Sequence, residues 1–310
     1  SHCTHIAMKL NVAELATRRQ ALIGALLATA PSHLQFASPA LAADPAPVQA
    51  LLDLIPAMPY GAPATNATVS RDLAARIDAA AAALEAKTAA KDLARDARLG
   101  GSWKLVYSDG REITSLAAGF PGGFELGPTY QVVDTKSGFF ENQGSVVNRY
   151  GAARLSTGVV GDVRPSKPGT LNAVGVVNDR GNRIDVDFKR ITFAFDELLG
   201  KPVDGPRKVL SPTPKPDAAQ PANDITYLDA TARVVRGGDG ALFVFRRDVD
   251  NGARPLLTAA QRAELFGDAS SIGVTTAGTA GALEADAPAE LRRLLREPAA
   301  APYNLGKQTR

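Results

Sequence analysis

Apolar and polar residues alternate in short stretches between residues 101 and 247, which is the pattern of half-buried β-strands. In the first stretch Trp103, Leu105 and Tyr107 occupy every second position. The next two strands are expected at residues 130–134 and 139–150, joined by a short polar turn. The pattern therefore predicts an antiparallel sheet built from hairpins.

The stretch from residue 184 to 195 predicts an irregular strand. Its apolar positions are even-numbered up to Phe188 and odd-numbered from Ile191 onward. Side chains of a strand alternate strictly, so this change of parity requires a bulge near residues 189–190. We expect residues 171–177 to precede this strand, through a hairpin loop at residues 178–182 that contains Gly181.

Two further segments complete the expected sheet. Residues 200–223 contain six prolines and predict a long exposed loop. Residues 225–235 and 241–247 are expected to form the last hairpin around a glycine-rich turn.

Helices are expected before and after the strands. Ser70 is a typical N-cap residue, and the Ala-rich segment that follows predicts one helix as far as Arg98. A shorter helix is expected at residues 48–55, inside a proline-rich linker at residues 43–70. Thr258 and Gln261 form a capping box that opens a short helix. Residues 253–310 are expected to hold this helix, another at 290–297 and a loose tail.

About eight strands that are not interleaved with helices favour a barrel over a Rossmann or TIM arrangement. The expected fold is mainly β: residues 71–252 hold an Ala-rich α-helix and then an antiparallel β-barrel, and short C-terminal helices follow.

The first 42 residues have the pattern of a cleaved twin-arginine targeting segment. Arg18 and Arg19 precede a short apolar run at residues 21–28, and Ala40-Leu41-Ala42 has small residues where a signal peptidase reads them. The run is shorter than the about 20 residues of a membrane-spanning helix. We expect cleavage before Ala43. An N-terminal amphipathic or buried helix, and a transit peptide ahead of Ser1, both stay open.

Composition excludes several classes of function. The single cysteine, Cys3, and the three histidines, His2, His5 and His33, all lie in the expected targeting segment. The remaining chain therefore has no thiol nucleophile, Ser-His-Asp triad, disulfide or Cys/His-ligated metal. Lys+Arg number 35 against 32 Asp+Glu, with no concentrated basic run, which argues against nucleic-acid binding. No catalytic residue, metal site or cofactor is predicted.

The first expected strand, residues 101–108 (GSWKLVYS), opens with a G-x-W motif, and in lipocalin-like barrels such a tryptophan plugs one end. This opening resembles the first strand of the plastid lipid-associated proteins, the PAP or fibrillin family. Residues 224–229 (DITYLD), 233–237 (RVVRG) and 242–245 (LFVF) are similar to the family's closing segment. The similarity covers roughly residues 70–250.

The resemblance implies a lipocalin-like barrel in the chloroplast that binds an apolar molecule, such as a quinone, a carotenoid or an acyl lipid. It implies peripheral association with the thylakoid or the plastoglobule, a lipid-droplet surface, and the twin-arginine pattern favours the thylakoid lumen. We expect a non-catalytic binding, carrier or structural protein. The alternatives are an assembly protein that docks on a thylakoid complex and a lipid-modifying enzyme that uses Tyr, Asp, Lys or Arg.

Candidate ligand contacts are the aromatic residues of the strands, which either line a cavity or fill a solid core. Asp229 and Arg233 are candidates for an inward ion pair that anchors a polar head group, or for a surface pair. The candidate ligand-binding residues are Trp103, Tyr107, Tyr130, Phe188, Phe193, Phe195, Tyr227, Asp229, Arg233 and Phe243.

Overall fold

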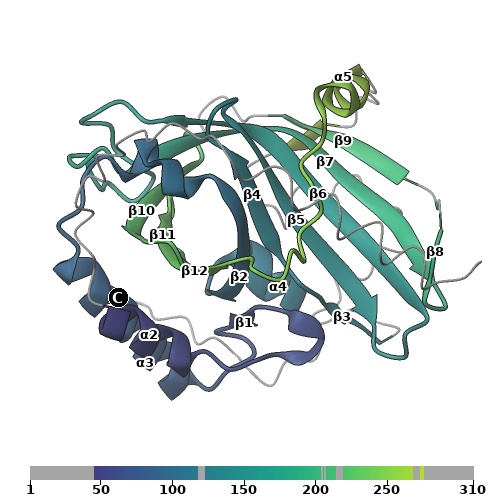
Figure 1. The fold of residues 1–310 in the computed structure, drawn as a ribbon, viewed down its shortest axis with the longest axis horizontal. Helices are drawn as coiled ribbons and strands as arrows, with labels where there is room; N and C mark the ends of the chain where they lie inside the picture. Colours follow the sequence, from purple (N-terminus) through teal and green to yellow (C-terminus); the bar gives the residue numbers. More distant parts are fainter. Residues whose placement is uncertain are drawn as a thin grey trace, which may run out of the picture. The chain divides into compact units, whose positions relative to one another are not determined.

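The computed structural model describes residues 45–117, 123–203, 205, 207–213, 219–267 and 273–275. Its centre is a closed barrel of eight antiparallel strands in the order β10-β11-β12-β2-β4-β5-β6-β7, closed by pairing of β10 with β7 (Figure 1). The strands are β2 (Gly101–Ser108), β4 (Tyr130–Asp134), β5 (Phe139–Asn148), β6 (Ala153–Pro165), β7 (Arg183–Leu198), β10 (Ala222–Leu228), β11 (Ala232–Gly237) and β12 (Leu242–Arg247). The antiparallel barrel expected from the alternation is confirmed.

The bulge expected in β7 is also confirmed. Val160 of β6 pairs with Arg190, whereas the next residue, Gly161, pairs with Phe188, so Lys189 is the extra residue. A Cβ atom at Gly161 would overlap the carbonyl oxygen of Asp187, so glycine permits this close approach. Because of the bulge, both halves of β7 keep their apolar side chains on one face.

Within the described residues, five short strands extend the sheet outside the barrel path. The first half of β7 pairs with β10, and its second half pairs with β9, so the sheet opens beyond the closed part. The five short strands each pair with a neighbour: β1 (Ala64–Thr65) with β2, β3 (Phe124–Leu126) with β5, β8 (Lys201–Pro202) and β9 (Arg207–Thr213) with β7, and β13 (Gly273–Thr275) with β9.

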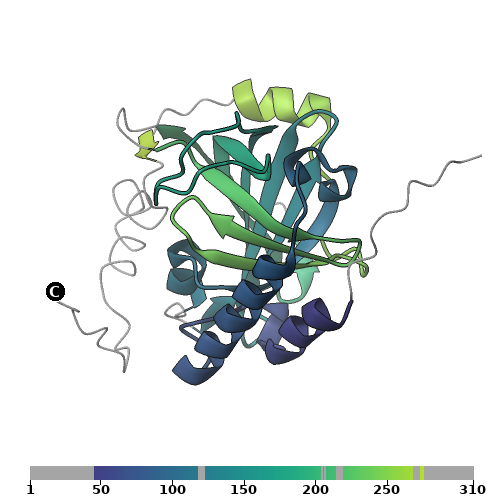
Figure 2. The same ribbon diagram turned by 90° about the vertical axis from the view of Figure 1, so that its left-hand side faces the viewer.

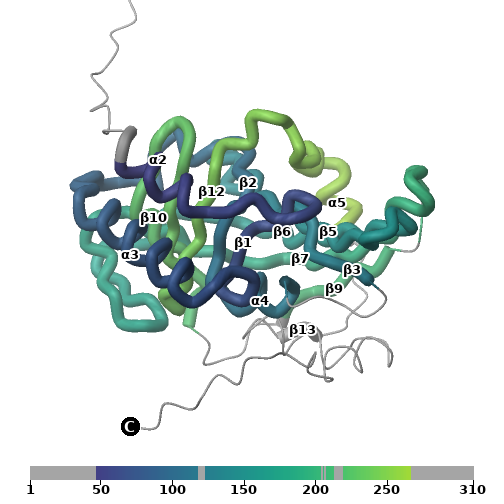
Figure 3. Tube along the Cα trace, turned by 90° about the horizontal axis from the view of Figure 1, so that it is seen from below, coloured from purple at the N-terminus to yellow at the C-terminus, as the bar shows by residue number. Residues whose placement is uncertain are grey.

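Two helices cover the outside of β10, β11 and β12 (Figures 1 and 2). They are α2 (Pro45–Leu54) and α3 (Arg71–Lys87), which lie next to each other in Figure 3. Ser70 caps α3 as expected, because its hydroxyl accepts the backbone N–H of Leu73 at 3.2 Å. Glu85 of α3 accepts two hydrogen bonds from the guanidinium of Arg236, which ties α3 to β11.

The chain after β12 runs along another part of the outer surface. Gln143 of β5 holds the backbone of Arg254 through two hydrogen bonds of 2.7 and 2.8 Å. The capping box at Thr258 and Gln261 is formed and opens α5 (Ala259–Gly267). On the barrel, α5 packs Leu265 into a small apolar cluster with Phe139 and Val160. No helix within the described residues is both long enough and apolar enough to cross a membrane.

The Ala-rich helix ends eleven residues earlier than expected. The Thr88 hydroxyl donates to the carbonyl of Leu84, and the backbone of Asp92 is left-handed with φ of 57°. The backbone N–H groups of Asp92 and Ala94 donate to carbonyls of the loop before β7, so residues 88–100 form two 3₁₀ turns, η2 (Leu93–Arg95) and η3 (Ala97–Leu99). Tertiary contacts here override a composition that favours helix.

The prediction of a strand at residues 171–177 is wrong. The strand that precedes β7 and pairs with it is β6. Asn172 accepts the backbone N–H groups of Val174 and Val176, which fixes a compact loop instead of a strand. Gly181 has the expected positive φ, 70°. It lies in the loop 166–182, which connects β6 to β7. The 13-residue strand β6 was missed because its small residues hide the apolar alternation.

Two other expectations need correction. The proline-rich segment at residues 200–223 contains strand β9, in which Val209 and Leu210 are buried against the second half of β7. Residues 225–235 are two strands, β10 and β11, because Asp229 accepts the N–H groups of Thr231 and Ala232 and forms a tight turn. The helix Arg111–Ala117, α4, was not expected. The expected targeting segment at residues 1–42 and the expected helix at 290–297 lie outside the described residues.

Candidate ligand-binding site

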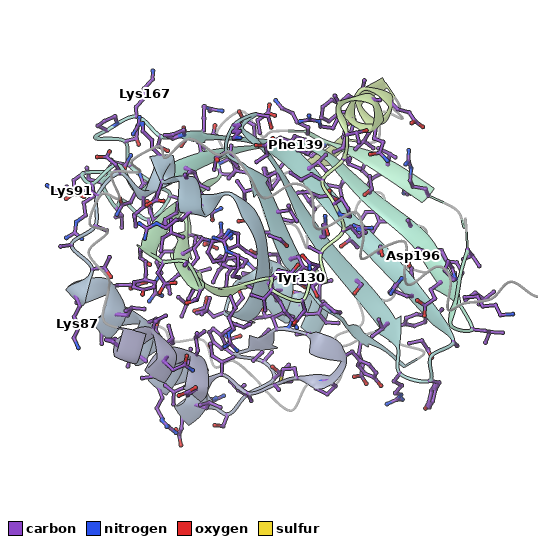
Figure 4. All side chains as sticks on the ribbon, in the orientation of Figure 1. Lys87, Lys91, Tyr130, Phe139, Lys167 and Asp196 are labelled. Carbon is purple, nitrogen blue, oxygen red and sulfur yellow. The ribbon has the colours of Figure 1, made fainter. Side chains whose placement is uncertain are left out.

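The inner face of the barrel is defined by the pairing register. Trp103 pairs with Gln131, and Gln131 pairs with Asn142, so these three side chains share one face. The strand residues of this face form an apolar cluster with residues of the 3₁₀ turns. Figure 4 shows side chains drawn densely inside the ring of β10, β11, β12 and β2. The buried members of the cluster are Leu93, Ala94, Leu99, Trp103, Leu105, Val133, Phe140, Ile184, Val186, Ile225, Leu228, Val235 and Phe245.

Trp103 closes one end of the barrel. Its side chain is fully buried, and its indole Nε1 donates to the carbonyl of Leu99 at 2.9 Å. The guanidinium of Arg247 lies 3.7 Å from the centre of the indole and donates to the carbonyls of Gly100 and Arg98. The indole, the 3₁₀ turns and Arg247 therefore seal this end, which we call the floor of the barrel.

Arg233 lies just above the floor, inside the barrel. Its side chain is 1% exposed and lies 5.0 Å from the centre of Trp103 and 4.2 Å from the centre of Phe245. Its Nη2 donates to Oε1 of Gln131 at 2.6 Å, and the Gln131 amide donates in turn to Asn142. A polar row of three side chains thus crosses an apolar interior.

The charge of Arg233 is not balanced by a carboxylate within the part of the chain that the structure describes. Its contacts there are Gln131 and the two aromatic rings, and its Nε is buried without an acceptor. Burial lowers the pKa of the Arg233 guanidinium to about 9, and the nearby charge of Arg247 acts in the same direction. The guanidinium is therefore a desolvated cation.

Phenylalanines line the inner face further from the floor. Phe188 meets Phe140 edge-on at 5.9 Å between ring centres, and Phe243 stacks beside Phe245 at 6.5 Å. Phe193 packs with Ile191, and Phe195 pairs with Leu155 of β6. Unlike Trp103 and Leu99 at the floor, Phe188, Phe193, Phe195 and Phe243 are only partly buried. This region therefore presents accessible apolar surface on a concave sheet.

The remaining tyrosine candidates lie on the outer face. Tyr107 and Tyr227 belong to the cluster that packs under α2 and α3. The hydroxyl of Tyr130, labelled in Figure 4, lies next to Gly252 in the segment that follows β12. Burial raises the pKa of the Tyr107 hydroxyl to about 12, and the carboxylates of Asp109 and Asp78 act in the same direction. Of the other strand aromatics, Phe139 packs outside against α5.

The inward ion pair considered for Asp229 and Arg233 is not formed. Asp229 lies in the turn between β10 and β11, where it accepts the hydroxyl of Tyr227 at 2.6 Å. Arg233 lies inside the barrel on β11. The two residues are separated by a chain reversal that the single-strand interpretation did not include.

Sequence reasoning missed the residues that complete the polar row. In β4, Gln131 and Val133 lie on the same face of the strand. The polar Gln131 at an apolar position of the alternation could therefore have been recognised from the sequence. Asn142 shares that property in β5. For Arg247, which follows the apolar run of β12, the sequence contains no comparable signal.

A hollow of about 230 Å³ lies outside the barrel, between α3, β10 and the loop before β7. Its lining combines charged residues such as Glu85, Arg180 and Asp224 with the apolar residues Val176, Val177 and Ile225. Beside it, Arg183 is 1% exposed and makes a two-point ion pair with Asp224. Its Nη atoms also donate to the carbonyls of Thr170 and Val176, so this cluster pins the loop 166–182 to the barrel.

Comparison with known proteins gives one finding. A protein-family model described as PAP_fibrillin matches residues 48–246, which is more than half of the chain. The match begins in α2 and ends in β12, so it spans the outer helices and the whole barrel. No curated protein matched the chain.

Proposed function

The chain belongs to the PAP_fibrillin family, whose members are plastid lipid-associated, and from this premise we propose that its barrel binds one hydrophobic small molecule without transforming it. Quinones, carotenoids and acyl lipids are the candidate ligands. The observation that supports this proposal is the inner face above the floor, where Phe188, Phe193, Phe195 and Phe243 are only partly buried. The protein is then a carrier or a structural component, not an enzyme.

The energetics of such binding are favourable. Burying one CH₂ group contributes about 0.8 kcal/mol, so a chain of about fifteen such groups gains roughly 12 kcal/mol before costs. Loss of translational and rotational freedom and ordering of the ligand cost about 4–15 kcal/mol. A dissociation constant in the micromolar range is therefore reasonable from apolar contacts alone.

For location, we propose peripheral association with the thylakoid on its lumenal side, with the plastoglobule as the alternative. The family supports a plastid location. The paired Arg18 and Arg19 ahead of a short apolar run support export by the twin-arginine route after a targeting segment at residues 1–42. A chain free of cysteine after Cys3 suits a folded export route, because it needs no oxidative folding.

A fluorescence titration tests the binding proposal. Trp103 is the only tryptophan and lies at the floor of the barrel, so its emission reports on the interior. We expect a quinone to quench this emission saturably. Phe193→Ala removes inner apolar surface worth about 1.5–3 kcal/mol at full burial, so it is expected to raise the Kd about tenfold.

The matched control is Phe266→Ala, which removes the same ring from the exposed side of α5, where Phe266 is 36% exposed. Its Kd should equal that of the unchanged protein. If no quinone, carotenoid or fatty acid binds saturably, the carrier proposal is wrong, and the protein docks on a thylakoid complex instead.

A further inference from the structure

We propose that the ligand of the barrel is a long-chain amphiphile with an anionic head group, a carboxylate, and that Arg233 binds this head group at the floor. The inference rests on the proposed function, because it assigns the chemistry and the orientation of the same ligand. The head lies against Arg233, and the chain runs along the inner phenylalanines toward the opposite end.

The first argument is electrostatic. A buried guanidinium is costly unless it is paired with an anion and fully hydrogen-bonded. Arg233 has one hydrogen bond, to Gln131, and a buried Nε that donates to no acceptor. Within the described residues its charge meets only a neutral amide and two aromatic rings. A ligand carboxylate supplies both the missing charge and the missing acceptor, in the fork geometry that a guanidinium prefers.

The second argument is position. The cross-strand row Leu228-Arg233-Phe245-Leu105 lies directly inside the Trp103 floor. The guanidinium reaches from β11 past β12 and β2 to Gln131 of β4, so it spans the interior instead of lining one wall. A ligand that enters head first from the end opposite Trp103 passes the phenylalanines before its head group reaches Arg233. The chain then remains in contact with the phenylalanines.

The third argument is the contrast with two other arginines of the same barrel. Arg183 is equally buried but is neutralised by Asp224 and saturated by two backbone carbonyls. Arg247 covers Trp103 and donates to three backbone carbonyls, those of Arg98, Gly100 and Ala230. These two arginines have structural partners, whereas the buried Nε of Arg233 has no acceptor within the described residues and is available to a ligand.

Calorimetric titration of the full chain with oleic acid and with oleyl alcohol, at a pH where the acid is ionised, tests the inference. The two probes share one chain and differ in the charge of the head. We expect the acid to bind about tenfold more tightly or better, the gain typical of hydrogen bonds to a charged group. Arg233→Met should bind both probes with the affinity of the alcohol.

The control is Arg164→Gln, which removes one positive charge from the outer face, where the side chain of Arg164 is 52% exposed. It should keep the full preference for the acid. The ligand-free Arg233→Met protein should also unfold at a higher denaturant midpoint, because it no longer buries an unpaired charge; a purely structural arginine would give a lower midpoint.

The outcomes separate the two proposals. Equal affinity of the unchanged protein for acid and alcohol overturns the anionic head group and leaves the proposed function in place. Retention of the preference in Arg233→Met overturns the role of Arg233. Binding of neither probe, nor of a quinone or a carotenoid, overturns the proposed function as well.

Discussion

Replacing Trp103 with alanine is expected to lower the free energy of unfolding by about 3–5 kcal/mol, the range for a fully buried aromatic side chain. The indole has no exposed surface and fills the closed end of the barrel between Arg233 and Arg247. Its removal leaves a cavity and an unpaired carbonyl at Leu99, and it takes the indole face away from the guanidinium groups of Arg233 and Arg247. Denaturant unfolding followed by circular dichroism measures this loss.

Two variants calibrate the result. Trp103→Phe keeps an aromatic ring but loses the hydrogen bond to Leu99, so its loss should be smaller than that of Trp103→Ala. Tyr150→Ala removes a ring that is 77% exposed and should leave the midpoint unchanged. An unchanged midpoint in Trp103→Ala would mean that Trp103 does not close the barrel.

Arg183→Met is expected to destabilise the protein by about 3–5 kcal/mol, as for breaking a buried ion pair from one side. The substitution leaves the Asp224 carboxylate, of which 17% is exposed, without its cation. It also frees the carbonyls of Thr170 and Val176, so the loop 166–182 loses two of its hydrogen bonds to the barrel. The denaturant midpoint gives the total loss, and proteolysis within this loop should become faster.

The matched control is Arg154→Met on the outer face of β6. Arg154 pairs with Asp196 and Glu197, but its side chain is 43% exposed, and such pairs contribute about 0–1 kcal/mol. Equal midpoints for Arg154→Met and Arg183→Met would contradict the structural role of the buried pair.

Much of the barrel could be predicted from the sequence, because side-chain alternation reports directly on burial. The parity change between Phe188 and Ile191 is sufficient to place the bulge at Lys189. Strand β6 was missed because Gly158 and Gly161 interrupt its alternation, although the close approach of the Asp187 backbone requires a glycine at position 161. The pairing of β7 with β10 joins Arg183 to Asp224, and a partner so distant along the chain gives no local signal.

The candidate site shows a second limit, because a bulge reverses the face of every residue beyond it. Val106 is the extra residue between Leu105 and Tyr107, so Tyr107 points outward under α3. In β10, Thr226 is the extra residue before Tyr227, so Tyr227 also points outward. Alternation alone placed both tyrosines on the inner wall. In β7 the change of parity in the sequence marks the bulge at Lys189, so Phe193 and Phe195 were placed correctly on the same face as Phe188.

The central claim, that the barrel carries one hydrophobic molecule with an anionic head group, is tested most directly by mass spectrometry of a solvent extract of natively purified protein. The account predicts one predominant long-chain acidic lipid, close to one molecule per chain and depleted in the extract of Arg233→Met. An extract of the unchanged protein with no lipid above background would contradict it.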